Sequence, residues 1–244
     1  MPGSSILFEW HASRAAECLK DTLNDFDSAA QTDGYSAYSS YNAIRPDKRK
    51  LKKACCWAHV RRKFHIAQEG SPLARAVLKD IQDLYKVEAE LRESGVSTQE
   101  RKIRRKAASA PVLAVIKQKL ESQRSQYLPD SLTGKAIKYT LNRRDELYVY
   151  VDDGRIEIDN NLIENAIRPS ALGRKNWLFF GSKSGGWQNA VMYMIMANCK
   201  MHGINPEEYL RDVLDQLPHI TAGKVRQLSP TKWLAARQAE IRSA

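Results

Sequence analysis

A long helical stretch from about Pro72 to Tyr150 most constrains the fold of this chain, because it separates two shorter regions of mixed pattern. Its first helix carries one apolar face made of Leu73, Val77, Ile81, Leu84 and Leu91. "STQERKIRRKAAS" then has the residues of a capping box, and Pro111 is placed to begin a further helix. Helical spacing continues through Ile137, Leu141, Arg144, Tyr148 and Val151, with Gly154 as the expected C-terminal cap. A hairpin for "LYVYVDDGRIEI" is the less favoured alternative.

The region before this stretch alternates between strand-like and helical patterns. "SILFEW" is β-prone, and "SRAAECLKDTLNDF" reads as a helix with Ser13 placed to cap it. "SAAQTDGYSAY" predicts a strand that ends at Asp33, with Gly34 allowing a sharp turn. "KKACCW" is a third β-prone run and leads into the basic helix "AHVRRKFHIAQ". This order of strands and helices indicates an α/β or α+β core.

The charge of the chain narrows the class of partner. The net charge is +11 over 244 residues, spread over several runs, which favours a polyanion as the partner. A merely soluble basic protein remains an open alternative. We find no apolar run of about 18 residues and no signal-peptide pattern, so no membrane partner is expected. Four irregularly spaced cysteines favour a reducing cytoplasm, and the motifs of NTPases, dinucleotide enzymes and serine hydrolases are absent, so no small-molecule substrate is expected.

The stretch "DNNLIENAIRP" has two interpretations. Asn161 and Glu164 have the spacing of a helix N-cap with its N3 carboxylate, and Arg168-Pro169 has the pattern of a helix exit. Alternatively, Asn161, Glu164, Asn165 and Arg168 share one polar face, on which a carboxylate could hold a metal whose other ligands are water and phosphate oxygen. Ile163 and Ile167 share another face of that helix.

Asp33 has a similar pair of interpretations. Asp-Gly is a common turn at a strand end, but a carboxylate in that position can also bind Mg²⁺ in a two-metal site. A zinc site from Cys55, Cys56, His59 and His65 is improbable, because their spacing fits no standard finger. Cys55 and Cys56 are expected in a buried strand. Core packing is expected of Met192, Ile195, Met196 and Cys199.

Five segments together resemble transposases of the insertion sequence 66 family: "QTDGYSAY", "CCWAHVRRKF", "DDGRIEIDNNLIENAIRP", "LGRKNWLFFGS" and "KMHGINPEEYLRDVL". Each segment alone is a weak resemblance, but five such segments in this order are specific to the family. The resemblance implies an α/β fold, a partial ribonuclease-H-like core with a large helical insertion and a helical carboxy-terminal region. The implied domains are residues 1–65 (first part of the core, with Asp33), 66–153 (insertion), 154–218 (end of the core, with Glu164 and carboxy-terminal helices) and 219–244 (peripheral tail).

The same resemblance implies the chemistry, DNA transposition of the DDE type, in which acidic residues hold Mg²⁺, with Mn²⁺ as a substitute. Asp33 would be the second catalytic Asp and Glu164 the catalytic Glu, both as metal ligands. No residue here matches the first Asp, so the chain is expected to be a carboxy-terminal portion, inactive in strand transfer unless that Asp is supplied to complete a two-metal site. DNA-binding residues would be His59, Arg61, Arg62, Asn161, Asn165, Arg168, Arg174, Lys175 and Asn176.

Partners would therefore be DNA, with a second copy of the chain or a full-length transposase, and the protein would be nucleoid-associated when bound. A non-catalytic DNA-binding or regulatory subunit is the alternative from another class. An unrelated ribonuclease-H-like nuclease explains the carboxylates but not the five ordered segments.

Overall fold

The computed structural model describes residues 5–45, 51–177 and 181–243. The chain divides into two compact units, one formed by Arg14–Asn161 and the other by Met1–Ser13 with Leu162–Ala244. The described residues are mostly helical and include one small parallel sheet. The predicted α/β class is therefore confirmed only to the extent that helices and parallel strands both occur. The predicted domain bounds stay a prediction.

The small sheet lies in the Arg14–Asn161 unit and joins two short strands. β1 (Ala29–Thr32) runs parallel to β2 (Lys52–Cys55), with Ala29 opposite Lys52 and Thr32 opposite Cys55. The helix α2 (Ser36–Ile44) lies between them in sequence, as a parallel pair requires a crossover. Both strands were predicted, and β1 ends at Thr32, one residue before the predicted end at Asp33.

Two predictions for the first residues are wrong. "SILFEW" forms no strand; instead the backbone N–H and C=O of Ile6 are hydrogen-bonded to the Asn198 side chain, which takes the place of a neighbouring strand. The following helical segment begins as a 3₁₀ helix at Ala16–Leu19 and continues as α1 (Lys20–Leu23). Ala15 occupies its N-cap position, so Ser13 is not the cap.

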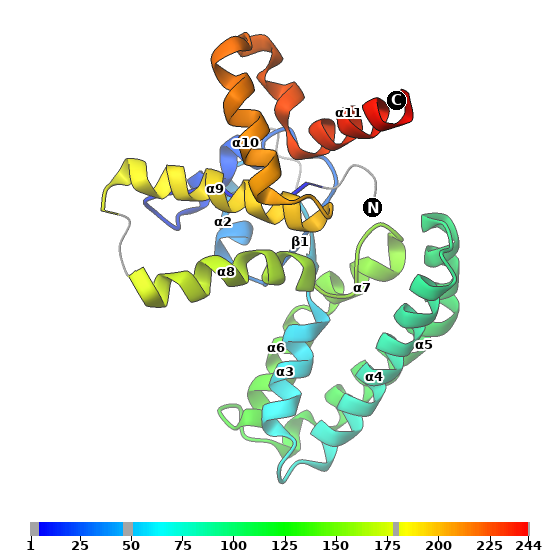
Figure 1. Ribbon diagram of the computed structural model, residues 1–244. Helices are drawn as coiled ribbons and strands as arrows, with labels where there is room; N and C mark the ends of the chain where they lie inside the picture. Colours follow the sequence, from blue (N-terminus) through cyan, green and yellow to red (C-terminus); the bar gives the residue numbers. More distant parts are fainter. Residues whose placement is uncertain (1–4, 46–50, 178–180, 244) are drawn as a thin grey trace. The chain divides into compact units, whose positions relative to one another are not determined.

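The predicted helical stretch is a set of packed helices in the same unit. They are α4 (Pro72–Glu93), α5 (Thr98–Gln123), a 3₁₀ turn (Arg124–Gln126), α6 (Leu132–Asn142) and α7 (Arg144–Asp152). The predicted basic helix precedes them as α3 (Trp57–Ala67). Figure 1 shows α4 and α5 side by side. Ser71 and Ser97 cap them, since each Oγ accepts the N–H three residues later. The predicted apolar face of α4 is buried as expected.

Helix boundaries differ from expectation at three places in this unit. Pro111 lies inside α5 and begins no new helix, because Leu113 and Ile116 continue a buried face across it. Arg143 separates α6 from α7. Gly154 is not the C-cap of α7, a position held by Asp153; its role is close packing, because a Cβ there would overlap the Thr98 carbonyl oxygen.

The regular secondary structure described in the second unit is all helical. Its elements are α8 (Asn161–Trp177), which starts at the boundary residue, α9 (Lys183–Met201), α10 (Pro206–Gln216), two 3₁₀ segments (Leu217–His219 and Ala222–Leu228) and α11 (Pro230–Ser243). Asn205 caps α10 as expected. The helix exit expected at Arg168-Pro169 is wrong, since α8 continues through Pro169.

Each unit has its own apolar core. In the second unit, Cys199, Tyr209 and Val213 pack with Leu228 and Trp233 from the end of the chain. Core packing is therefore confirmed for Cys199 and for Ile195, which lies against this cluster, but is wrong for Met192 and Met196, which are exposed. No helix among the described residues is long and apolar enough to cross a bilayer.

Candidate metal and nucleic-acid site

Asp33 stands exposed in the turn that follows β1. Its Oδ1 accepts the backbone N–H of Tyr35 at 2.9 Å, and the Gly34 N–H donates to Thr32 Oγ1 at 3.2 Å. Gly34 has a φ of 82°, a conformation that glycine adopts without strain. Among the described residues, no lysine or arginine is ion-paired with Asp33. The turn interpretation is thus confirmed, and it leaves the second carboxylate oxygen open to a ligand.

A polar cavity of about 260 Å³ lies beside this turn. Thr32, Gly34, Tyr35 and Ser39 line one part of it; Lys53, Asn142, Arg143 and Glu146 line the rest. Lys53 is ion-paired with Glu146 and donates to Ser39 Oγ at 2.9 Å. The cavity therefore brings charged residues of β2, α7 and the α6–α7 junction to the carboxyl end of β1.

Two cations flank an aromatic ring near Asp33. Lys63 Nζ lies 4.6 Å from the Tyr139 ring centroid, and the Arg143 guanidinium lies 4.3 Å from it. Arg143 also donates to the Gly34 carbonyl at 3.4 Å. The pKa of Tyr139 is raised to about 12, chiefly by burial, with the charge of Asp33 among the lesser causes. Sequence reasoning missed Arg143 and Tyr139, because helical spacing was expected to continue across them and the structure instead ends α6 at Asn142 and begins α7 at Arg144.

Glu164 lies half-buried in the first turn of α8, where Asn161, Asn165 and Arg168 are exposed. The N-cap interpretation of Asn161 is wrong, because Asn161 is already inside the helix and Asp159 accepts from both its N–H and its Nδ2. Asp159 is held in turn by the Tyr85 hydroxyl at 3.0 Å. These bonds fix the start of the helix that carries Glu164.

A buried arginine holds the segment that leads from α7 to α8. Arg105 Nη1 donates to the carbonyl oxygens of Tyr150 at 2.7 Å, Asp153 at 3.2 Å and Ile156 at 2.8 Å. Glu88, also fully buried, binds Arg105 at 2.7 and 2.6 Å. Helices α4 and α5 therefore fix the chain a few residues before Glu164.

The remaining predicted residues fall into three groups. His59, Arg61 and Arg62 lie on α3, with both arginines exposed. Asn176 is exposed near the end of α8, whereas the side chains of Arg174 and Lys175 lie outside the described residues. Asp33 belongs to one compact unit and Glu164 to the other, so the convergence of the two carboxylates stays a prediction.

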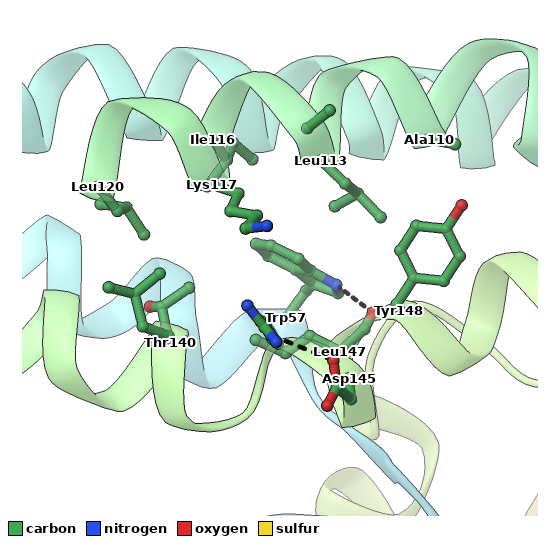
Figure 2. Close-up of a pocket in the computed structure, with 13 residues that line it drawn as sticks. Trp57, Ala110, Leu113, Ile116, Lys117, Leu120, Thr140, Asp145, Leu147 and Tyr148 are labelled. Carbon is green, nitrogen blue, oxygen red and sulfur yellow. Dashed lines mark hydrogen bonds and ion pairs between the residues drawn. The ribbon is translucent and has the colours of Figure 1, made fainter. Parts of the chain in front are cut away.

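A further pocket of about 440 Å³ contains none of the predicted site residues. Figure 2 shows that the Trp57 indole donates to the Leu147 carbonyl, at 3.0 Å, under a wall formed by Leu113, Ile116 and Leu120. The hydrogen bond joins the start of α3 to α7. This pocket is therefore part of the packing that holds α3 and α7 together.

Comparisons with known proteins identify the relatives of the chain. Residues 3–188 match the family described as Transposase IS66 family, and residues 195–234 match the IS66 C-terminal element. Two Sinorhizobium fredii proteins described as uncharacterized, y4jD and y4qI, are each 34% identical to this chain, over 91% and 87% of its length. The chain covers 44% and 40% of those relatives, less than half of each. No solved structure matches.

Proposed function

Because the chain belongs to the IS66 family of transposases, we propose that it acts in DNA transposition through metal-dependent phosphodiester cleavage and strand transfer. The family match over most of the chain is the observation that carries this proposal. We place Asp33 and Glu164 in a ribonuclease-H-like core as the second acidic residue and the catalytic Glu. The relatives are longer than this chain, so the activity is proposed for a protein that also supplies a first acidic residue.

The donor set suits Mg²⁺ or Mn²⁺. Asp33 offers a hard oxygen ligand that faces solvent and is not ion-paired within the described part of the chain, and Glu164 offers a second carboxylate. When bound, a pair of such ions stabilises the attacking and leaving oxygens of a phosphodiester. The turn made by Tyr35 and Gly34 holds Asp33 at the strand end, and the Asp159 contacts fix the start of the Glu164 helix.

Cations near each carboxylate would position the DNA backbone. Arg168 is exposed one turn after Glu164, and Arg174 and Lys175 follow on the same helix. Lys63 and Arg143 flank Tyr139 near Asp33 and add two cations that the sequence pattern did not predict. Arginine and lysine contacts to phosphate fix the register of a DNA strand without reading its sequence.

Metal binding tests the carboxylate assignment directly. We expect Asp33→Asn and Glu164→Gln each to weaken Mn²⁺ binding at least about tenfold, measured by calorimetry or electron paramagnetic resonance. Asp130→Asn and Glu69→Gln make the same chemical changes at exposed carboxylates elsewhere and should leave the affinity unchanged. Equal affinity in all five proteins would refute the assignment.

A non-catalytic DNA-binding subunit is the second candidate, favoured by the net charge of +11. DNA binding that persists while Mn²⁺ binding is absent from the unsubstituted chain would support this candidate over the first.

A further inference from the structure

A basic groove lies between α3 and α4 in the Arg14–Asn161 unit. Its volume is about 560 Å³. Arg61, His65 and Gln68 line one wall, and Arg75, Leu78, Lys79, Gln82 and Tyr85 line the other. Figure 1 shows the two helices that form these walls, joined by a short connection after Ala67. We refer to this feature as the α3–α4 groove.

The charge of the groove has one sign. Arg61, Arg75 and Lys79 are permanent cations with exposed side chains, and no carboxylate is among the lining residues. Arg75 Nη1 donates to the Gln68 carbonyl at 2.9 Å, which orients its guanidinium. Within the described ranges, neither Arg61 nor Lys79 forms an ion pair, and the nearby Asp83 is paired with Lys86 at 2.8 Å. The groove therefore holds cationic charge that its own residues do not neutralise.

The spacing of these cations suits a linear polyanion. Arg75 and Lys79 are four residues apart on α4, and Arg61 and His65 are four apart on α3. Residues four apart share a helix face and rise about 6 Å along it. Two facing rows of donors can contact successive phosphates of a strand, whereas a single phosphate ion would need donors that converge on one point.

One end of the groove is linked to the segment that precedes α8. Tyr85 lines the groove, and its hydroxyl donates to Asp159 at 3.0 Å. Burial, and then the charge of Asp159, raise the pKa of Tyr85, so the phenol stays protonated and adds no negative charge to the groove. Asp159 also binds Asn161, the first residue of the Glu164 helix.

From these observations we propose that the α3–α4 groove binds the phosphodiester backbone of DNA, at a contact separate from the Asp33 and Glu164 carboxylates. This inference rests on the proposed function for the choice of DNA as the polyanion. The lining residues Gln68, Leu78 and Gln82 are uncharged, so they add no negative charge that would repel a phosphate. The contact recognises the backbone and not the base sequence, so it should act on any duplex.

Salt-dependent binding of the whole chain tests this proposal. The variant Arg75→Gln/Lys79→Gln is compared with Lys102→Gln/Lys106→Gln, which removes the same charge from α5 outside the groove. Binding to a labelled duplex is measured across a salt series in EDTA, so that no metal contributes. We expect the groove variant to reduce the slope of log affinity against log salt by about one to two, and affinity by about 3–30-fold, for unrelated sequences alike. The α5 variant should stay within about twofold of the unsubstituted chain.

Further variants separate a DNA contact in the groove from a general effect of charge or folding. Arg75→Lys/Lys79→Arg keeps both charges and should keep the salt slope, and circular dichroism checks that every variant is folded. Loss of Mn²⁺ binding in Asp33→Asn or Glu164→Gln reports on the carboxylate assignment, whereas loss of DNA binding by the groove variant in EDTA reports on the groove. Equal loss in the groove and α5 variants would overturn the proposal. So would saturable binding of inorganic phosphate that the groove variant abolishes without any change in DNA affinity.

Discussion

At the scale of single residues, burial and a neighbouring carboxylate together raise the pKa of the Cys55 thiol. Its Sγ donates to Glu146 Oε2 at 2.8 Å, and its pKa is raised to about 12, first by burial and then by Glu146. A raised pKa means that the folded state holds the proton more tightly. The protonated thiol therefore makes its full contribution to the free energy of unfolding below pH 9.0, its ordinary pKa. That contribution is lost as the pH rises from 9.0 to about 12.

We expect Glu146→Gln to lower the pKa of Cys55 toward 9.0, because the substitution removes the negative charge and leaves Lys53 nearby. Ultraviolet absorbance of the thiolate during a pH titration measures this change. Glu69→Gln, an exposed change elsewhere, is the control. An unchanged titration in Glu146→Gln would mean that burial alone sets the pKa.

The sequence predicted some of the residues at the candidate site and missed others. Asp33 and its turn followed from a β-prone run that ends in Asp-Gly, because this dipeptide has strong local preferences. Lys63, Tyr139 and Arg143 were not grouped, because they come from α3, α6 and the α6–α7 junction and meet only through packing. Their contact is a cation–π arrangement, which leaves no periodic signal in sequence.

At the scale of elements, the buried pair of Glu88 and Arg105 joins α4 and α5 to the segment after α7. We expect Arg105→Met to cost about 3–5 kcal/mol in the free energy of unfolding, since it breaks a buried ion pair and removes a donor from three carbonyls. Glu88→Met/Arg105→Met should cost less than the sum of the two single substitutions. Glu88→Met alone leaves Arg105 buried without this carboxylate, and Arg105→Met alone leaves Glu88 with only its weaker contact to Arg101, at 3.2 Å. Denaturant unfolding of the four proteins gives the coupling energy.

Hydrogen exchange distinguishes a local effect of Arg105 on the segment after α7 from an effect on the stability of the whole unit. Amides near Asp153 and Ile156 should lose protection in Arg105→Met and in the double variant, while those in the middle of α4 lose less. Uniform loss across the unit would show that Arg105 acts on the whole core and not on this segment.

The elements themselves were predicted best where periodicity was long. The apolar face of α4 repeats over several turns, so both the helix and its buried side were correct. Pro111 and Pro169 misled the prediction of boundaries, because proline disfavours a helix interior by about 3 kcal/mol and yet both helices continue through it. For α5, the buried face across Pro111 offsets that local cost.

At the scale of the whole molecule, the second unit depends on the first residues of the chain. Asn198 binds the Ile6 backbone although 192 residues separate them, and a Cβ on Gly186 would overlap the Trp10 ring. Such pairing across the chain cannot be read from local pattern, which is why "SILFEW" was predicted as a strand. Asn198→Ala should therefore loosen residues 5–10, with greater protease sensitivity there and little change in α4 or α5.

The division into two units leads to a prediction about independent folding. The larger core, which includes Trp57, Phe64, Leu84, Ile116 and Tyr150, lies wholly within Arg14–Asn161. A domain of this length can bury a core without help from other segments. We expect residues 14–161 alone to give a helical spectrum and one cooperative thermal transition.

A fragment of residues 162–244 alone tests whether the second unit needs the first residues of the chain. They lack the first thirteen residues, whose contacts with Asn198 and Gly186 belong to the same unit, so we expect a broader transition and weaker helical signal from this fragment. Adding a peptide of residues 5–13 should restore part of that signal, because it returns the bonds to Asn198 and the ring against Gly186. A fragment 162–244 that unfolds as sharply without the peptide would show that α9, α10 and α11 need only their own core of Cys199, Tyr209 and Trp233.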